Sequence, residues 1–447
     1  MSPQTSKQEL LDKRARVIGS TCQIFYKEDP LCVARASGQY IYDENGEKYL
    51  DCISNVQHVG HCHPVVVETI SAQLASSTCN ARFVSPALTE CAERILETLP
   101  GLDTVLFVNS GSEANDLALR LARDFSKHED LVVLDHAYHG HLTTTMQMSP
   151  YKFDHGATPG KPEWIHVAPV PDVYRGLHRL ADSELRDEQA LSAAGLAYSQ
   201  DVASVIQKAQ SNGRRIAGFI SEALQSCGGQ VIPPRGYFLQ VAEHVHAAGG
   251  VMILDEVQTG YGRVGSHFWA YKLYDDGFVP DIVTMGKPMG NGFPVSAVVT
   301  RREISDKLGG GVGYFNTYGG NPVSCAAVLG VLRVLREERL IDHSARMAAL
   351  YKEKLEALKE KHQCIGDVRG VGQFWGIDLV ESRETRVPTA SLAASLILKT
   401  RREFHVLLSA DGPHSNIIKL KPPLCFDENN LNEAVAAIDK ALTELGH

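Results

Sequence analysis

Short apolar runs recur through the middle of the chain, and they constrain its fold more than any other feature. Each run is bounded by glycine, asparagine or charged residues, and helical patterns such as Glu113–Phe125 and Gly236–Ala248 lie between the runs. Short strands that alternate with helices are typical of an α/β layer with a largely parallel sheet. Examples of the predicted strands are Thr104–Val108, Leu131–Leu134, Ile216–Ile220, Val251–Leu254 and Ile282–Met285.

The pattern changes after about Pro322. Two long helical stretches, Val323–Arg336 and Ile341–Lys361, are followed by strand-like pieces at Phe374–Leu379 and Ile417–Leu420. This order predicts a smaller α+β lobe, and a chain of 447 residues is too long for one simple core. The predicted organisation is an N-terminal segment, 1–65, that joins the small domain, a large domain, 66–322, and a C-terminal small domain, 323–447.

Two further local patterns are informative. Gln39–Tyr42 and Lys48–Leu50 flank the dipeptide Asn45-Gly46, which is a strong signal for a hairpin turn. The polar stretches Gly156–Glu163 and Gln189–Gln200 are expected to be loops or insertions.

Composition and charge exclude several classes of function. Hydrophobic residues make up 44% of the chain and charged residues 22%, which is ordinary for a globular protein. The net charge of -9 argues against nucleic acid as the main partner, and no stretch has the roughly 18 uninterrupted apolar residues of a membrane span. The polar start lacks the apolar run of a signal peptide, and the ten cysteines are scattered. The cytoplasm is therefore the expected compartment.

Unusual residues follow four of the predicted strands, at the sheet edge where ligands of parallel α/β folds sit. After the first strand, residues 108–115 read VNSGSEAN and lead into a helical pattern. Small residues let backbone amides approach an anion, and a helix N-terminus adds positive potential, so this turn is a candidate phosphate seat. An ordinary helix cap built from serine or asparagine is the alternative.

Tyr138 and His139 follow the second strand. A flat aromatic ring there could stack on a planar cofactor, although a lone loop tyrosine more often closes over a core. The neighbouring histidines, His136 and His141, raise the alternative of a metal site, as do His61, Cys62 and His63, but neither group has the ligand spacing of a zinc site.

An acidic pair and a lysine follow the other two strands. Asp255 and Glu256 end a strongly apolar run, and a buried carboxylate requires a partner such as a protonated ring nitrogen or Arg263. Lys287 lies in a glycine-rich turn, where it could be desolvated and used as an amine nucleophile, or could simply face solvent. Together the four strand ends supply a phosphate seat, a stacking ring, an acid and an amine, which are the parts that bind pyridoxal 5'-phosphate (PLP).

The chain resembles the class III aminotransferases, which are PLP enzymes of fold type I. The segments NSGSEAND, HAYHG, DEVQTGYGR, GKPMGNG and NTYGGNP stand in the order and approximate spacing of that family. The match covers nearly the whole chain. It implies an α/β fold in which a mostly parallel seven-stranded sheet forms the large domain and a smaller α+β domain accompanies it.

The resemblance also implies roles for individual residues. Lys287 would carry PLP as a Schiff base, Asp255 would pair with the pyridine nitrogen, and Tyr138 would stack on the ring. Thr317 would reach the cofactor phosphate of the neighbouring subunit, which makes a homodimer the minimal working unit. The remaining cofactor-binding residues implied by the match are Gly111 and Ser112 at the phosphate, Gln258 at the ring hydroxyl, His139 and Glu222.

Within that family the chain is most similar to phospho-lyases that act on ethanolamine phosphate or phosphohydroxylysine. The similarity includes SPYKF, HVAPVPDVYRG, QSCGGQVIPPRGYF and LKPPLCF. Aminotransferases of this class often bind a substrate carboxylate with an arginine before the Pro-Pro motif, which a glutamate gates. Lys419 and Cys227 occupy those two positions, and a lysine lacks the planar two-point clamp of arginine.

The resemblance therefore implies a carbon–oxygen lyase that converts O-phosphoethanolamine to acetaldehyde, ammonia and phosphate. Lys287 would take the proton from the carbon that bears the amine, and cations would neutralise the leaving phosphate. Candidates for those cations, in order, are Lys419, Arg82 and Arg175. The alternatives are a phosphohydroxylysine phospho-lyase, an ω-amine:oxo-acid aminotransferase, and a PLP-binding protein without activity.

Overall fold

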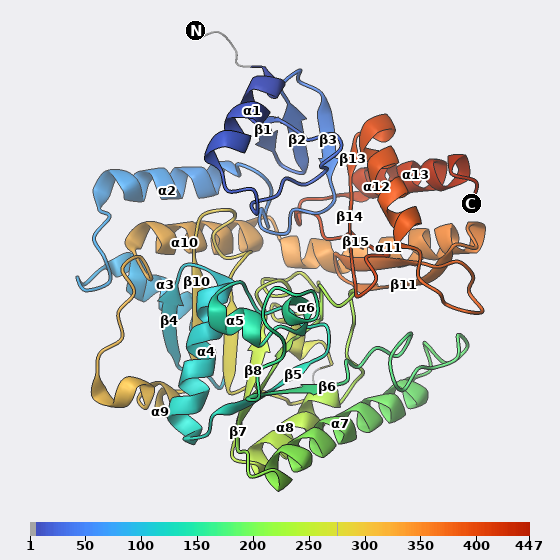
Figure 1. The fold of residues 1–447 in the computed structure, drawn as a ribbon. Helices are drawn as coiled ribbons and strands as arrows, with labels where there is room; N and C mark the ends of the chain where they lie inside the picture. Colours follow the sequence, from blue (N-terminus) through green and yellow to red (C-terminus); the bar gives the residue numbers. More distant parts are fainter. Residues whose placement is uncertain (1–5, 275) are drawn as a thin grey trace.

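A seven-stranded sheet forms the centre of the large lobe in the computed structural model, which describes residues 6–274 and 276–447 (Figure 1). β10 runs antiparallel to both of its neighbours, and the other adjacent pairs are parallel, so the sheet is mostly parallel as predicted. In spatial order the strands are β4 (Thr104–Val108), β10 (Ser296–Thr300), β9 (Ile282–Met285), β8 (Val251–Asp255), β7 (Ile216–Glu222), β5 (Asp130–Leu134) and β6 (Ile165–Ala168).

The central strands are apolar along their whole length because helices cover both faces of the sheet. In β5, Leu131 and Val133 join one hydrophobic cluster, whereas Val132 and Leu134 join the other. This alternation follows from the two-residue period of a strand. Burial on both faces explains why these strands read as continuous hydrophobic runs in the sequence.

Three helices follow strands of the sheet and pack on it. They are α4 (Gly111–Ser126), α7 (Glu188–Ser211) and α8 (Tyr237–Ala247). α4 packs on the face that contains Leu131, and α7 and α8 pack together on the opposite face. A second group of helices packs against itself beside β4, namely α2 (Pro64–Ser76), α3 (Pro86–Leu96) and α10 (Pro322–Glu337).

One expectation about local structure is wrong: Gln189–Gln200 lies inside the helix α7 and is not a loop. The Asp187 side chain accepts a hydrogen bond from the Ala190 amide and so caps this helix. Ala194, Tyr198 and Val202 recur every fourth residue and are buried. Because alanine and serine occupy much of this stretch, its apolar face is weakly marked in the sequence and the polar residues dominate the pattern.

The smaller lobe contains two four-stranded sheets. One has the order β11-β12-β15-β14 and the other the order β1-β2-β3-β13. The expected hairpin is present, with β2 antiparallel to β3, although both strands extend one residue beyond the predicted end. The strands are β1 (Val33–Ser37), β2 (Tyr40–Asp43), β3 (Lys48–Asp51), β11 (Ile365–Val371), β12 (Phe374–Leu379), β13 (Val406–Leu407), β14 (Ser409–Asp411) and β15 (Ile417–Leu420).

β13 pairs in parallel with β3, so the first strands of the chain lie beside its last elements (Figure 1). This pairing supports the assignment of residues 1–65 to the small domain, and the boundaries at 65 and 322 stay a prediction. The remaining elements are α1 (Lys7–Val17), α5 (Thr143–Gln147), α6 (Pro150–Phe153), η1 (Ala270–Lys272), α9 (Arg302–Ser305), η2 (Leu308–Gly311), α11 (Leu340–Lys361), α12 (Ala390–Phe404) and α13 (Glu428–Glu444).

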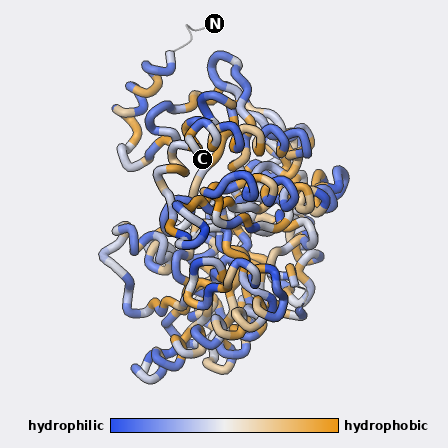
Figure 2. Tube along the Cα trace, turned by 90° about the vertical axis from the view of Figure 1, so that its right-hand side faces the viewer, coloured by the Kyte–Doolittle hydropathy of each residue, from blue (hydrophilic) through white to orange (hydrophobic). Residues whose placement is uncertain are grey.

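Hydrophobic and hydrophilic residues are interleaved along most of the trace in Figure 2, as helices and strands with one buried side require. Among the described residues, no helix combines the length and the apolar character needed to cross a membrane.

The two lobes meet at a buried arginine. Arg263 is fully buried and donates to the backbone carbonyls of Gln373 and Pro422, and its Nη2 lies 3.1 Å from Nδ1 of His58. Burial lowers the pKa of Arg263 to about 10. Gly372, in the turn between β11 and β12, packs directly on the backbone of Arg263.

We expect Gly372→Ala to lower the free energy of unfolding by about 3 kcal/mol or more. Gly372 has a φ of +57°, and a Cβ there would lie 2.2 Å from the Arg263 carbonyl oxygen, which belongs to rigid backbone. Gly46→Ala is the matched control, because Gly46 also has a positive φ but no heavy atom near its Cβ position. It should cost about 1 kcal/mol. Equal losses for the two variants in urea unfolding would contradict the close contact between the lobes.

Candidate active site at the carboxyl ends of the parallel strands

A cavity of about 220 Å³ lies where β4, β5, β7, β8 and β9 end. Residues that follow each of these strands line it, as expected for ligand sites in parallel α/β sheets. The cavity therefore brings together eight of the predicted site residues: Gly111, Ser112, Tyr138, His139, Glu222, Asp255, Gln258 and Lys287.

The predicted phosphate seat is the start of α4. This helix begins at Gly111, and the first amides of a helix have no partner within it, so they are available to an anion. A Cβ on Gly111 would lie 2.8 Å from the Val257 side chain, and one on Gly140 would lie 2.6 Å from Oγ of Ser112. Glycine at both positions thus allows close approach of the backbone. The Ser110 side chain caps the helix, so the alternative of an ordinary cap is true as well.

Asp255 is held in place by three donors. Its Oδ2 accepts from Nδ2 of Asn115 at 2.7 Å and lies 2.9 Å from Nδ1 of His139, and its Oδ1 accepts from the Val257 amide at 3.0 Å. The carboxylate is only 4% exposed. Arg263, which was the alternative partner, bonds elsewhere in the structure. The arrangement fixes a buried acid beside the cavity, and no lysine or arginine of the described residues forms an ion pair with it.

The neighbouring acid Glu256 points away from the cavity. Its oxygens accept from Oγ1 of Thr259 at 2.6 Å and from the Tyr271 amide at 2.8 Å. Burial raises the pKa of Glu256 to about 7. Of the adjacent pair, Asp255 is therefore the residue available to a ligand.

Glu222 supports the loop that carries Tyr138. Its two carboxylate oxygens accept from the amides of Tyr138 at 3.2 Å and Ser226 at 2.9 Å. Burial raises the pKa of Glu222 to about 7. The Tyr138 ring packs edge-on against Tyr151, with 5.9 Å between the ring centroids. Glu222 thus positions the stacking ring through the backbone.

Lys287 follows β9 and lines the same cavity. Among the residues that the structure describes, none forms a hydrogen bond or an ion pair with its amine. A Cβ on the preceding Gly286 would lie 2.7 Å from Oγ of Ser296, so the backbone at this turn is tightly packed. The geometry leaves the Lys287 amine available for chemistry, and Asp255 lines the same cavity.

Sequence reasoning missed Lys421. This residue follows β15 and is 3% exposed, and its Nζ donates to Oγ of Ser226 at 2.6 Å and to Oε1 of Gln258 at 2.8 Å. Burial, followed by the positive charges of Lys419 and Lys287, lowers the pKa of Lys421 to about 7. The signal in the sequence was a second lysine two residues after Lys419, directly before the Pro-Pro motif.

Lys419 lies near Cys227, the residue at the other position of the expected carboxylate clamp. The positive charge of Lys419 opposes the effect of burial, which raises the pKa of the Cys227 thiol to about 12. Nζ of Lys419 lies 2.5 Å from Oδ2 of Asp411, so its charge is already paired. Lys419 and Cys227 lie close together, but Lys419 already forms an ion pair with Asp411.

Three other predicted residues lie outside the cavity. Arg82 is exposed, with its guanidinium 3.8 Å from the centroid of the Phe315 ring. Arg175 forms an ion pair with Asp378 in the small lobe. Thr317 is exposed and lines a separate surface hollow. The structure therefore does not bring these residues to the strand ends within one chain.

The histidines that raised a metal alternative have other partners. His139 contacts Asp255, His61 lies 2.7 Å from Asp51, and His63 lies 2.9 Å from Glu338. His136 can approach two carboxylates, those of Asp135 and Asp154, but this group is at the surface and apart from the cavity lining.

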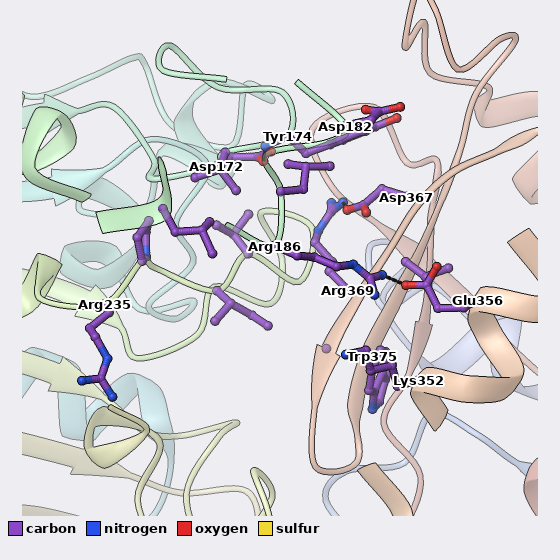
Figure 3. A pocket seen from close by; sticks show the side chains of 18 of the residues that line it. Asp172, Tyr174, Asp182, Arg186, Arg235, Lys352, Glu356, Asp367, Arg369 and Trp375 are labelled. Carbon is purple, nitrogen blue, oxygen red and sulfur yellow. Dashed lines mark hydrogen bonds and ion pairs between the residues drawn. The ribbon is translucent and has the colours of Figure 1, made fainter. Parts of the chain in front are cut away.

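A larger cavity of about 480 Å³ lies between the two lobes (Figure 3). Charged side chains on its wall pair with one another, as Arg186 does with Glu356 and Arg369 with Asp367. None of the residues that follow the five strands lines it. Asp255, Lys287 and the start of α4 do not line this larger cavity, so we place the candidate site in the smaller one.

Known proteins are similar to this chain over nearly its whole length. The family model described as Aminotransferase class-III matches residues 25–442. The chain is 65% identical over 438 residues to Ethanolamine-phosphate phospho-lyase homolog 1 of Caenorhabditis elegans, covering 98% of this chain and 94% of that protein. It is 49% identical over 444 residues to Alanine--glyoxylate aminotransferase 2-like of Drosophila melanogaster, covering 99% and 88%.

A solved structure is similar over nearly the whole length. It is a phospholyase from Arthrobacter in complex with phosphoethanolamine, with a TM-score of 0.89 and 36% identity, covering 97% of this chain and 99% of that one.

We expect Glu222→Gln to flatten the pH dependence of stability between pH 4.5 and about 7. The unfolded chain releases this proton near pH 4.5, whereas the folded chain keeps it to about pH 7, so the free energy of unfolding falls as the pH rises through this window. In the variant, the slope of the free energy of unfolding against pH should be smaller by the contribution of about one proton. Urea unfolding of the cofactor-free protein at several pH values measures it, with the exposed Glu337→Gln as control. An unchanged slope in Glu222→Gln would rule out a buried, protonated Glu222.

Proposed function

This chain belongs to the class III aminotransferase family, whose members use PLP, and from that premise we propose that it is a phospho-lyase. The reaction is the elimination of inorganic phosphate from O-phosphoethanolamine, which gives acetaldehyde, ammonia and phosphate. The observation that carries the proposal is the 65% identity, over 98% of the chain, to a protein named as an ethanolamine-phosphate phospho-lyase homologue. The Arthrobacter phospholyase in complex with phosphoethanolamine supports the same substrate class.

The residues around the cavity fit PLP. The first amides of α4 suit its phosphate, and the buried Asp255 carboxylate suits a protonated ring nitrogen. The amine of Lys287 has no partner among the described residues, and buried Nε2 of His139 has none either. Groups without hydrogen-bond partners in the lining of one cavity are what a polar, planar cofactor satisfies.

When bound, PLP supplies an electron sink for the carbon that carries the substrate amine. Lys287 then acts as the base that removes a proton from this carbon. Asn115 and His139 orient the Asp255 carboxyl group, so that a positive charge opposite it would be stabilised. The bond from the neighbouring carbon to the phosphate oxygen breaks, phosphate takes the electron pair, and the remaining enamine is hydrolysed to acetaldehyde and ammonia.

We propose Lys419 as the cation that binds the substrate phosphate. A phosphate that carries two negative charges can compete with the Asp411 carboxylate for this ammonium, and Cys227 beside it adds no negative charge because burial raises its pKa. None of the three candidates lines the cavity itself, but Lys419 lies close enough to affect the pKa values of Lys421 and Cys227. Arg82 and Arg175 are weaker candidates, because Arg82 lies over the Phe315 ring and Arg175 is paired with Asp378.

An amine:oxo-acid aminotransferase is the second candidate. The 49% identity to a relative named as an aminotransferase favours it. Lys419 and Cys227 count against it, since they replace the arginine and glutamate expected for binding an oxo acid. Phosphohydroxylysine stays an alternative substrate, because it carries the same phosphate and amine groups.

The purified holoenzyme should release phosphate, ammonia and acetaldehyde in equal amounts from O-phosphoethanolamine without any oxo acid. Lys287→Ala should lower kcat by about a thousandfold or more, because both the attachment point and the base are lost. Colorimetric phosphate and coupled aldehyde assays measure this. Turnover that requires an oxo acid and yields no phosphate would establish the aminotransferase instead.

We also propose that two copies of the chain form the working unit. Large apolar side chains are exposed around Thr317, which is the residue expected to reach the partner's cofactor. Val84 is fully exposed, Tyr318 is 70% exposed and Phe83 is 64% exposed. Monomeric proteins seldom leave so much apolar surface in one region.

The cytoplasm is the proposed compartment, because all ten cysteines are free thiols.

Phe83→Glu combined with Val84→Glu should convert the protein from a dimer to a monomer in light scattering, because charges in an apolar interface are costly to bury. Leu177→Glu is the control, since Leu177 is 66% exposed but belongs to a different surface segment. It should leave the mass unchanged. A wild-type protein with the mass of one chain would exclude the proposed dimer.

A further inference from the structure

A second ammonium group lies beside the cofactor cavity, and the reaction proposed above does not use it. Lys421 is 3% exposed, and its two hydrogen-bond acceptors, Ser226 and Gln258, are both uncharged. Within the described part of the chain, no carboxylate lies within 4.0 Å of its Nζ. A buried cation without a counter-ion costs stability, so a purely structural role explains it poorly.

The contacts of Lys421 fix the orientation of Gln258. Oε1 of Gln258 accepts from Nζ of Lys421 at 2.8 Å and from Nδ2 of Asn55 at 3.1 Å. A reversed amide would bring its NH2 group against two donors, one of them on an ammonium group, which is unfavourable. The Gln258 NH2 group has no partner among the described residues, and Gln258 lines the cavity. This amide therefore presents a donor to whatever the cavity binds.

We infer that Lys421 is a positioning residue for the cofactor: with Asn55 it locks Gln258 so that the amide NH2 donates to the anionic ring oxygen of PLP. It also places a positive charge behind that hydrogen bond. A donor and a nearby cation both favour the anionic form of an acceptor oxygen. The inference depends on PLP binding, which the family shares, and not on the identity of the substrate.

The groups around Lys421 leave its positive charge without a counter-ion, which an anionic oxygen of the cofactor would supply. The titratable groups that act on it are Lys419 and Lys287, which lower its pKa, and Cys227 and Asp411, which raise it. Burial has the largest effect, and the resulting pKa is about 7. An anionic oxygen two hydrogen bonds away opposes this lowering, so cofactor binding and protonation of Lys421 favour each other.

The test uses the holoenzyme and Lys421→Met, which keeps the length of the side chain and removes its charge. We expect the pH midpoint of the visible absorbance band of bound PLP to rise by about half a unit or more, because a nearby positive charge favours proton loss from the cofactor. The Kd for PLP should rise as well, by about tenfold.

Two further variants separate the effect of the Gln258 orientation from the effect of the Lys421 charge. Asn55→Leu removes the neutral donor to Oε1 but keeps the ammonium, so it should weaken PLP binding and shift the midpoint less than Lys421→Met does. The double variant Lys419→Met with Asp411→Asn removes the neighbouring ion pair as a whole, so the net charge near Lys421 does not change. It should leave the midpoint within about 0.2 units.

Thermal unfolding of the cofactor-free proteins controls for structural damage. Lys421→Met should be at least as stable as the wild type without PLP, because it removes an uncompensated charge and little volume. Should this variant fail to fold, Asn55→Leu tests the same lock through PLP affinity.

An unchanged midpoint and an unchanged Kd for PLP in Lys421→Met would overturn the inference. If the KM for O-phosphoethanolamine alone rose, the ammonium would serve the substrate phosphate and not the cofactor. The absorbance measurement needs no substrate, so its failure leaves the phospho-lyase proposal intact. A protein that lacks phosphate release but shows the expected shift refutes only the proposed reaction.

Discussion

The buried carboxylate of Asp255 is the constraint on which the site depends. It ends β8, its oxygens accept from Asn115 on α4 and from the Val257 amide, and His139, after β5, lies within hydrogen-bonding distance. These contacts tie three strand ends to one point. Burying an acid in this way costs free energy that only good hydrogen bonding offsets. These contacts hold the start of α4 and the segment after β5 against the end of β8, so a ligand that enters the cavity meets a fixed acid.

Much of the large lobe could be predicted from the sequence because its strands are buried on both faces. Thr104–Val108 and Ile282–Met285 coincide with the observed strands, since continuous apolar runs mark such strands well. The chemistry at the strand ends was predictable for the same reason. α7 was missed because small residues form its buried face. β10 was not among the strands named from the sequence, and its apolar run SAVVT does not reveal its antiparallel direction.

Residues whose position depends on contacts far along the chain were harder to infer. Lys419 drew attention through its place before the Pro-Pro motif, whereas Lys421 acquires meaning only from Ser226 and Gln258, which lie on other segments. Arg175 was a reasonable candidate by charge, but Asp378 in the small lobe binds it. Three lysines near the cavity thus differ in their electrostatic surroundings. Lys287 has no partner among the described residues, Lys419 is paired with a carboxylate, and Lys421 is buried with neutral acceptors.

The parallel pairing of β3 with β13 joins the two ends of the chain. The strands β1–β3 therefore lack their fourth partner until β13, far along the chain, has folded against β3. Until then the edge of this sheet offers unsatisfied backbone groups, to which other chains can add. Contacts between such distant segments also slow folding. This sheet is therefore complete, and its edge at β3 covered, only after segments far apart along the chain have come together.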